Sequence, residues 1–213
     1  MSDAVAARPP SDQLATVLDV AERIVVAVLL MLLCERLLND YRASGRWINL
    51  LLLAGESLIV FFILIRRRTN FISVRPGDWF FAATGTAGPL LVAAGGHPLL
   101  AQPACGMILF CGLLLQLSAK FALRRSFGLV AANRGIKATG PYRLLRHPMY
   151  AGYLLSHIGF LLANPALWNL IVYVLADGSQ ILRMNAEERM LGEDPGYRTL
   201  CRNVRWRIIP FVY

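Results

Sequence analysis

Long apolar runs alternate along the chain with shorter polar segments, most of which are basic. About 20 consecutive apolar residues form a helix that crosses a bilayer, and shorter runs suffice when the flanking side chains reach the interface. The pattern therefore predicts an all-α, polytopic integral membrane bundle of about six transmembrane helices. The expected spans are 17–38, 47–65, 79–96, 99–119, 149–163 and 166–182.

Two of these expectations depend on particular residues. The third run is rich in Gly and Thr and contains Pro89, so five spans are the alternative. Between the last two runs the chain has only a turn at Asn164-Pro165, which predicts an antiparallel helical hairpin.

The composition supports a single membrane domain. Of the 213 residues, 56% are apolar and 16% are charged, whereas about a quarter of the residues in a soluble domain are charged. The apolar content excludes a disordered chain, and four scattered cysteines exclude a disulfide scaffold.

The net charge of +9 comes from 22 basic and 13 acidic residues. The basic residues lie between the apolar runs, which indicates an anionic membrane face rather than nucleic acid as the partner. Most of them follow the second, fourth and sixth runs, and only Arg42 and Arg46 lie clearly on the other side. Both termini and the long polar segments are therefore expected in the cytosol. Residues 1–13 do not have the pattern of a signal peptide and are expected to form a short cytosolic tail.

The longest polar segment, 120–148, leads directly into the last two runs. Gly140-Pro141 predicts a turn, and Pro148 suits the first position of the next helix. The free N–H groups of a helix start attract anions, and Arg146 and His147 lie at the same place. We expect an anionic group to bind there.

The fifth run has two faces. Tyr150, Tyr153 and His157 share one stripe, which indicates either a site or interfacial anchoring with one bonded histidine. Small residues share the other stripe and would let a second helix approach closely. They are Gly152, Ser156, Gly159 and Ala163.

The sixth run carries a row of polar residues at helical spacing: Tyr173, Asp177, Gln180, Arg183 and Glu187. Polar groups at membrane depth usually face the bundle interior and mark a site. Arg183 suits a carboxylate, and Glu187 can hold either that arginine or a cationic ligand. The alternative is an ion pair at the water surface.

These motifs carry a resemblance. The stretch 125–153, with its Arg-His-Pro-x-Tyr motif, and the later Arg183-x3-Glu187-Glu188 resemble the isoprenylcysteine carboxyl methyltransferase family. That family belongs to a wider membrane methyltransferase group that includes phospholipid N-methyltransferases. The resemblance divides the chain into N-terminal membrane helices, 1–115, and a methyltransferase-like catalytic region, 116–213.

The resemblance implies an integral membrane enzyme that uses S-adenosylmethionine, in a bacterial inner membrane or an ER-type membrane, with its active site facing the cytosol. It implies a lipophilic acceptor from the membrane, and it favours the carboxylate of a prenylcysteine-like or isoprenoid substrate. Arg183 and Glu187 are then the catalytic residues. The residues implied around the cofactor are Arg146, His147, Pro148, Tyr150, Gly152, Glu188 and Tyr197. The residues expected to line the substrate are Tyr153, His157, Asp177 and Gln180.

The sequence departs from the family pattern at two places. Cys201 stands where the family often has a second tyrosine, and 192–195 is a compact replacement for a longer helix. Asp177-Gly178 has no counterpart in the pattern.

Other functions stay open at this point. A phospholipid amine or a thiol acceptor needs a base, and His147, His157 or Glu187 could serve. A sterol-reductase-like reductase is disfavoured, because Met149 and Tyr153 replace its typical Asn and Glu. A non-catalytic membrane protein is the third class.

The histidines and cysteines are not at ligand spacing, so no metal site is expected. Glu56 lies within the second run and is either a pocket residue or a paired buried acid.

Overall fold

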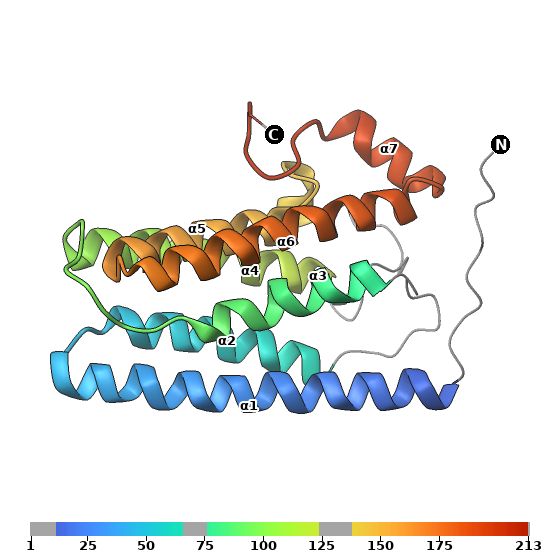
Figure 1. The fold of residues 1–213 in the computed structure, drawn as a ribbon. Coiled ribbons are helices and arrows are strands. Elements are labelled where there is room, and N and C mark those ends of the chain that lie inside the picture. The colour runs from blue at the N-terminus through green and yellow to red at the C-terminus, as the bar shows by residue number, and fades with distance from the viewer. Residues whose placement is uncertain (1–11, 66–75, 124–137, 213) are drawn as a thin grey trace.

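In the computed structural model, residues 12–65, 76–123 and 138–212 are described. Within these ranges the chain forms helices and turns and no strand (Figure 1). This confirms the predicted all-α class for the described residues. The elements are α1 (Asp12–Ser44), α2 (Ile48–Ile65), α3 (Pro76–Ala87), η1 (Gly88–Leu91), α4 (Gln102–Leu123), η3 (Gly140–Arg143), α5 (Pro148–Ala163), α6 (Leu167–Leu191) and α7 (Pro195–Asn203).

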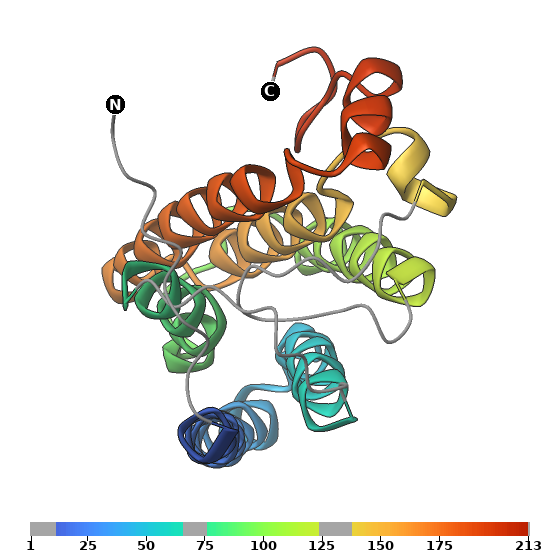
Figure 2. The same cartoon turned by 90° about the vertical axis from the view of Figure 1, so that its right-hand side faces the viewer.

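The long helices run between the same two ends of the molecule (Figure 1). At one end, here called the site end, α5 begins and α6 ends, and α7 and the C-terminal segment cover it (Figures 1 and 2). At the opposite end, here called the far end, α1 connects to α2 and α5 connects to α6. The predicted boundary between residues 115 and 116 lies inside α4, so the two sequence regions share this helix.

The small stripe of α5 packs against α4. A Cβ atom on Gly112 would lie 2.6 Å from the backbone nitrogen of Ser156, and one on Gly159 would lie 2.6 Å from the backbone nitrogen of Leu109. The prediction that these small residues let another helix approach closely is therefore confirmed, with α4 as the partner.

The predicted antiparallel hairpin of the last two helices is present, with residues 164–166 as its connection (Figure 1). The backbone of α5 nevertheless lies mainly against α4, and that of α6 against α3. The helices α5 and α6 therefore contact each other mainly through their side chains. Their polar stripes face each other, as the contacts Tyr150–Glu187 and His157–Asp177 show.

The predicted helix over 79–96 is wrong beyond residue 91. After α3 and the short η1, which contains Pro89, the chain forms no further helix up to the start of α4. Asn169 replaces the missing helical hydrogen bonds of Ala93, accepting from its N–H at 3.0 Å and donating to its carbonyl at 2.8 Å. Irregular backbone is tolerated at membrane depth when protein groups bond it in this way.

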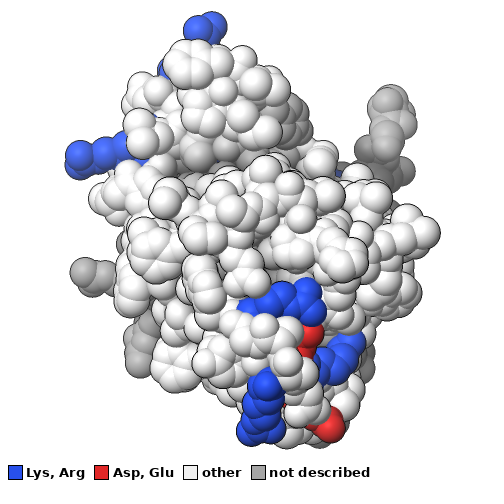
Figure 3. All heavy atoms as spheres, turned by 90° about the vertical axis from the view of Figure 1, so that its left-hand side faces the viewer, with Lys and Arg blue, Asp and Glu red and all other residues white. Residues whose placement is uncertain are grey.

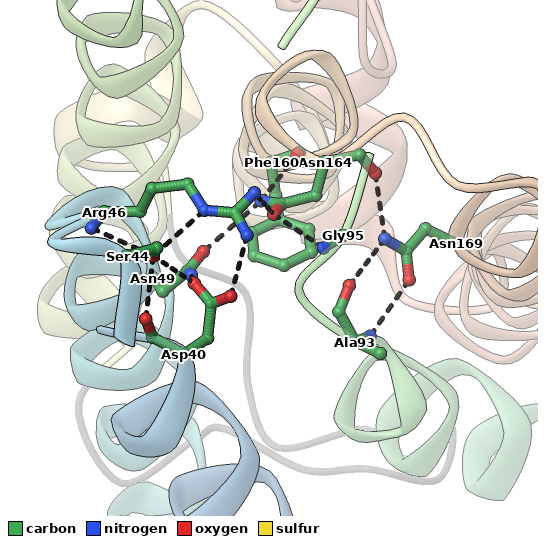
Figure 4. A network of polar contacts seen from close by, with 9 residues as sticks. All are labelled: Asp40, Ser44, Arg46, Asn49, Ala93, Gly95, Phe160, Asn164 and Asn169. Carbon is green, nitrogen blue, oxygen red and sulfur yellow. Dashed lines mark hydrogen bonds and ion pairs between the residues drawn. The ribbon is translucent and has the colours of Figure 1, made fainter. Parts of the chain in front are cut away.

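Asn164 is the centre of a polar network at the far end (Figure 4). Its side-chain oxygen accepts from the Gly95 backbone at 3.1 Å and from Arg46 at 3.3 Å. Arg46 also pairs with Asp40 at 2.7 Å. The network joins the end of α1, the end of α5 and the non-helical segment 92–101. Figure 3 shows that the face at this end is mostly uncharged, apart from charges gathered over the end of α1 and a few basic side chains at its upper edge.

Large apolar side chains point outward from several helices, which is unusual for a water-facing surface. On α4 they include Met107, Phe110, Leu114 and Phe121. Within the described residues, α4 is the one helix long and apolar enough to cross a membrane, and Ile48–Phe62 is apolar but shorter. The number of six spans therefore stays a prediction.

Candidate functional site

The start of α5 is held in place by the C-terminal segment. As predicted, a turn (η3) begins at Gly140, and Pro148 opens α5 after the N-cap residue His147. The N–H groups of Arg146 and His147 donate to the carbonyls of Trp206 at 2.8 Å and Arg207 at 2.9 Å. Residues about 60 positions apart therefore share one site.

Arg146 adds a second connection to the same segment. Its Nε donates to the Val204 carbonyl at 2.7 Å and its Nη2 to the Cys201 carbonyl at 3.2 Å. The arginine expected to bind a cofactor thus also holds α7 and the segment after it against α5.

Glu188 is the acceptor at the centre of this end. His147 Nε2 lies 3.2 Å from its Oε1, and Arg207 Nη2 lies 2.6 Å from its Oε2. Burial alone would raise the pKa of Glu188. The hydrogen bond and charge of His147, together with the charge of Arg207, outweigh burial and hold that pKa below its ordinary value. Burial and the neighbouring Glu188 carboxylate raise the pKa of Tyr197, so this phenol stays neutral.

Glu187 faces the same space from the next position of α6. It accepts a hydrogen bond from the Tyr150 hydroxyl at 2.6 Å and lies 3.5 Å from Arg183 Nε. The Arg183 guanidinium carbon lies 5.6 Å from the centroid of the Tyr150 ring, and Arg183 is only 3% exposed. Arg183 is therefore inside the bundle, whereas the side chain of its partner Glu187 is 20% exposed.

Deeper in the bundle, the aromatic stripe of α5 continues toward α6. The rings of Tyr150 and Tyr153 have centroids 6.2 Å apart, and the Tyr153 and His157 rings are nearly parallel at 6.5 Å. His157 Nδ1 lies 2.7 Å from the Asp177 carboxylate. These contacts place the two stripes on one interior face, with His157 hydrogen-bonded there, and whether this face is a binding site stays a prediction.

Two residues of the predicted site have other positions. Gln180 turns toward α3, where its Nε2 donates to the Gly85 carbonyl at 2.7 Å and its Oε1 accepts from Arg183 at 3.4 Å. Gly152 faces α4, because a Cβ atom there would lie 2.8 Å from the Gly112 carbonyl oxygen. The structure thus gives Gly152 a packing role and does not bring it to the cluster around Tyr150.

Lys120 was expected in the cytosolic segment 120–148, and this expectation is wrong. It lies inside α4 and is 1% exposed, with Nζ 5.2 Å from the centroid of the Tyr153 ring and 5.9 Å from that of Phe62. Glu56 of α2 is buried and interacts electrostatically with Lys120 and His157, as a paired buried acid would. A helical projection continued past residue 119 places Lys120 on the face of Gln116, which is the signal that finds it.

Arg207 is the other functional candidate that the sequence did not single out. It appeared only as one of several basic residues in the tail, and no spacing links it to Glu188. The fold brings the two together because the tail returns to the start of α5.

A comparison with known families matches part of this region. The profile of the phospholipid methyltransferase family matches residues 100–194, a little under half of the chain. The match includes α4, α5 and α6, and with them Tyr150, Arg183, Glu187 and Glu188. No curated protein matches the chain. The match supports a membrane methyltransferase of the wider group, and it does not show the isoprenylcysteine carboxyl methyltransferase family in particular.

Proposed function

We propose that this protein is an S-adenosylmethionine-dependent methyltransferase that acts on a lipophilic acceptor from the membrane. The observation that carries the proposal is the meeting of α5 and α6 at the site end. There Tyr150 contacts Glu187 and Arg183, and His147 contacts Glu188, within the region that the family profile matches.

The residues present fit the chemistry of S-adenosylmethionine. When bound, S-adenosylmethionine supplies a methyl group that is electrophilic because it is attached to a positively charged sulfur. The Tyr150 ring and the Glu187 carboxylate would hold a cation, because aromatic faces and carboxylates both favour positive charge. Arg146 and Arg207 would hold a carboxylate, and Glu188 would accept hydrogen bonds from hydroxyl groups.

The protein's own contribution is orientation and the exclusion of water. An in-line displacement depends on alignment of the reacting atoms, and a closed site prevents competing reactions. The C-terminal segment is held to Arg146 and His147 by backbone hydrogen bonds and lies over the start of α5. Glu187, which pairs with the buried Arg183, fixes the Tyr150 hydroxyl.

Among acceptors we place a lipophilic amine first. The Arg183 guanidinium already contacts Glu187, Gln180 and the Tyr150 ring, and these contacts compete with a substrate carboxylate. The description of the matched family points in the same direction. The carboxylate of a prenylcysteine-like or isoprenoid substrate is the second candidate, and the buried guanidinium beside Tyr150 is the feature that favours it.

We also propose that the site end faces the cytosol. The described basic residues after α4 gather at this end, and basic residues concentrate on the cytoplasmic side of membrane proteins. They include Arg143, Arg146, Arg189, Arg198, Arg202, Arg205 and Arg207.

The test is methyl transfer by the full chain in proteoliposomes with methyl-labelled S-adenosylmethionine. One arm contains phosphatidylethanolamine and the other N-acetyl-S-farnesylcysteine. We expect label in the amine headgroup, retained by Cys105→Ala and lost in Glu187→Ala. Base-labile methyl ester in the second arm would instead establish the carboxylate acceptor. Absence of label in both arms would contradict the proposal.

A further inference from the structure

His157 and Asp177 form an oriented acid–base pair deep in the bundle. His157 is 3% exposed, and its Nδ1 lies 2.7 Å from the Asp177 carboxylate. Because a carboxylate accepts, Nδ1 carries the hydrogen, and the lone pair of the neutral ring is on Nε2. Among the described residues no hydrogen bond to Nε2 is formed.

Tyr173 provides a second observation at the same place. Its ring stacks on His157 with centroids 4.3 Å apart and an interplanar angle of 15°. Tyr173 is 3% exposed, and its hydroxyl has no hydrogen-bond partner within the described part of the chain. Buried hydroxyl groups are nearly always hydrogen-bonded, so an unpaired one on the ring that stacks against His157 indicates a site for a polar ligand.

Titratable residues of two further helices lie near this pair. Glu56 of α2 interacts electrostatically with His157 and also influences Tyr173. Lys120 of α4 interacts with Glu56 and lies over the Tyr153 ring. A polar headgroup placed here would meet donors and acceptors from four helices rather than hydrocarbon.

The other possible bases of the site either face carboxylates or already accept hydrogen bonds. His147 lies 3.2 Å from Glu188 through Nε2 and 3.9 Å from Glu187 through Nδ1. Glu187 accepts from Tyr150 and pairs with Arg183. Of these groups, His157 has a ring nitrogen, Nε2, with no hydrogen bond or ion pair to another described residue.

We propose that His157, oriented by Asp177, is the general base for a protic acceptor, and that the Tyr173 hydroxyl binds the same headgroup. The inference rests on the proposed function and on its amine acceptor. The ammonium group R–NH3⁺ gives one proton to Nε2, which makes the imidazole an imidazolium and leaves R–NH2. The nitrogen lone pair then forms the N–CH3 bond, while the C–S bond of the donor breaks and its electron pair stays on sulfur.

Kinetics of His157→Asn test the base directly. Asparagine keeps a donor toward Asp177 but provides no base, so kcat falls by about 10²–10⁴-fold, the usual contribution of a general base. The same change at exposed His97 is the matched control and leaves kcat unaltered. The acid side of the pH profile of kcat changes in His157→Asn, because the acceptor ammonium must then give its proton to water. The titratable groups around His157 that enter this profile are Asp177, Tyr173, Tyr153 and Glu56. Lys120, which lies over the Tyr153 ring and interacts with Glu56, enters it as well.

Two measurements separate a catalytic from a structural effect. S-adenosylmethionine affinity, measured by calorimetry, stays at the wild-type value in a folded His157→Asn variant. In the wild type, titration with dioleoylphosphatidylethanolamine shifts the ¹⁵N resonance of His157 and leaves that of His97 in place. If His157→Asn does not fold, Asp177→Asn lowers kcat and Tyr173→Phe raises KM for the amine.

The outcomes distinguish this inference from the proposed function. The base assignment alone is overturned if His157→Asn keeps the wild-type kcat and pH profile. The same result in Asp177→Asn overturns it where only that variant folds. Transfer to a carboxylate acceptor and not to an amine also overturns it and keeps the methyltransferase. Absence of both S-adenosylmethionine binding and transfer in the wild type overturns the two together.

Discussion

The contact between α4 and α5 makes a sharp prediction for Gly152→Ala. A methyl group at this position would lie 2.6 Å from Cγ of Gln116, 2.8 Å from its backbone nitrogen and 2.8 Å from the Gly112 carbonyl oxygen. Two of these three atoms belong to the α4 backbone, so a side-chain rotation cannot relieve the clash. The two helices must separate instead.

The magnitude follows from two opposing effects. Alanine stabilises a helix interior relative to glycine by about 0.5–1 kcal/mol. Overpacking costs about 1–3 kcal/mol. Gly178→Ala on α6 is the matched control. A Cβ atom there meets nothing within 4 Å, so this variant gains the helix stability of alanine without any overpacking. The two variants should therefore differ by about 1–3 kcal/mol.

Thermal unfolding of both variants in one detergent is the assay. A difference of this size separates their midpoints by about 2–12 °C for a chain of this length, with Gly152→Ala the lower. Equal midpoints would refute the packing argument. If S-adenosylmethionine affinity falls in Gly152→Ala while its midpoint matches that of Gly178→Ala, this residue contacts the cofactor, as the sequence motif implied.

Three further predictions concern the two ends of the molecule. Arg183→Ala and Glu187→Ala each lower methyl transfer by more than about 100-fold, because the remaining member of the pair loses its charged partner. Cys105→Ala stays within a few-fold of wild type, and radiometric turnover measurements check all three variants. Asn164→Ala lowers the thermal midpoint through its lost buried hydrogen bonds, each worth about 1 kcal/mol, and leaves S-adenosylmethionine affinity unchanged, as unfolding and calorimetry show. Glu188→Gln is destabilising at pH 7, because the folded-state pKa of Glu188 lies below its ordinary value of 4.5, and unfolding curves should show the difference from wild type shrinking as the pH falls below that value.

Much of the helical fold was predictable from periodicity. The two stripes of the fifth run were separable because small and aromatic residues recur at helical spacing, and the structure places them against α4 and α6. The non-helical segment 92–101 was not predictable, since its stability depends on Asn169 and Asn164, which are distant in sequence.

The site shows the same limit. Local motifs predicted His147, Tyr150 and Glu188, because each lies in or beside a recognisable pattern. Lys120 was placed wrongly, since a charge after an apolar run was interpreted as the end of a span although the helix continues. Arg207 needed the return of the tail to the start of α5, a contact that no local pattern encodes.

The most direct test of the central claim is calorimetric titration of S-adenosylmethionine into the purified full-length protein, with NADPH as the control titrant. We predict saturable binding of the first compound alone, weakened in the double variant Glu187→Ala and Glu188→Ala. Heat of dilution only, or binding of NADPH with no binding of S-adenosylmethionine, would contradict the account.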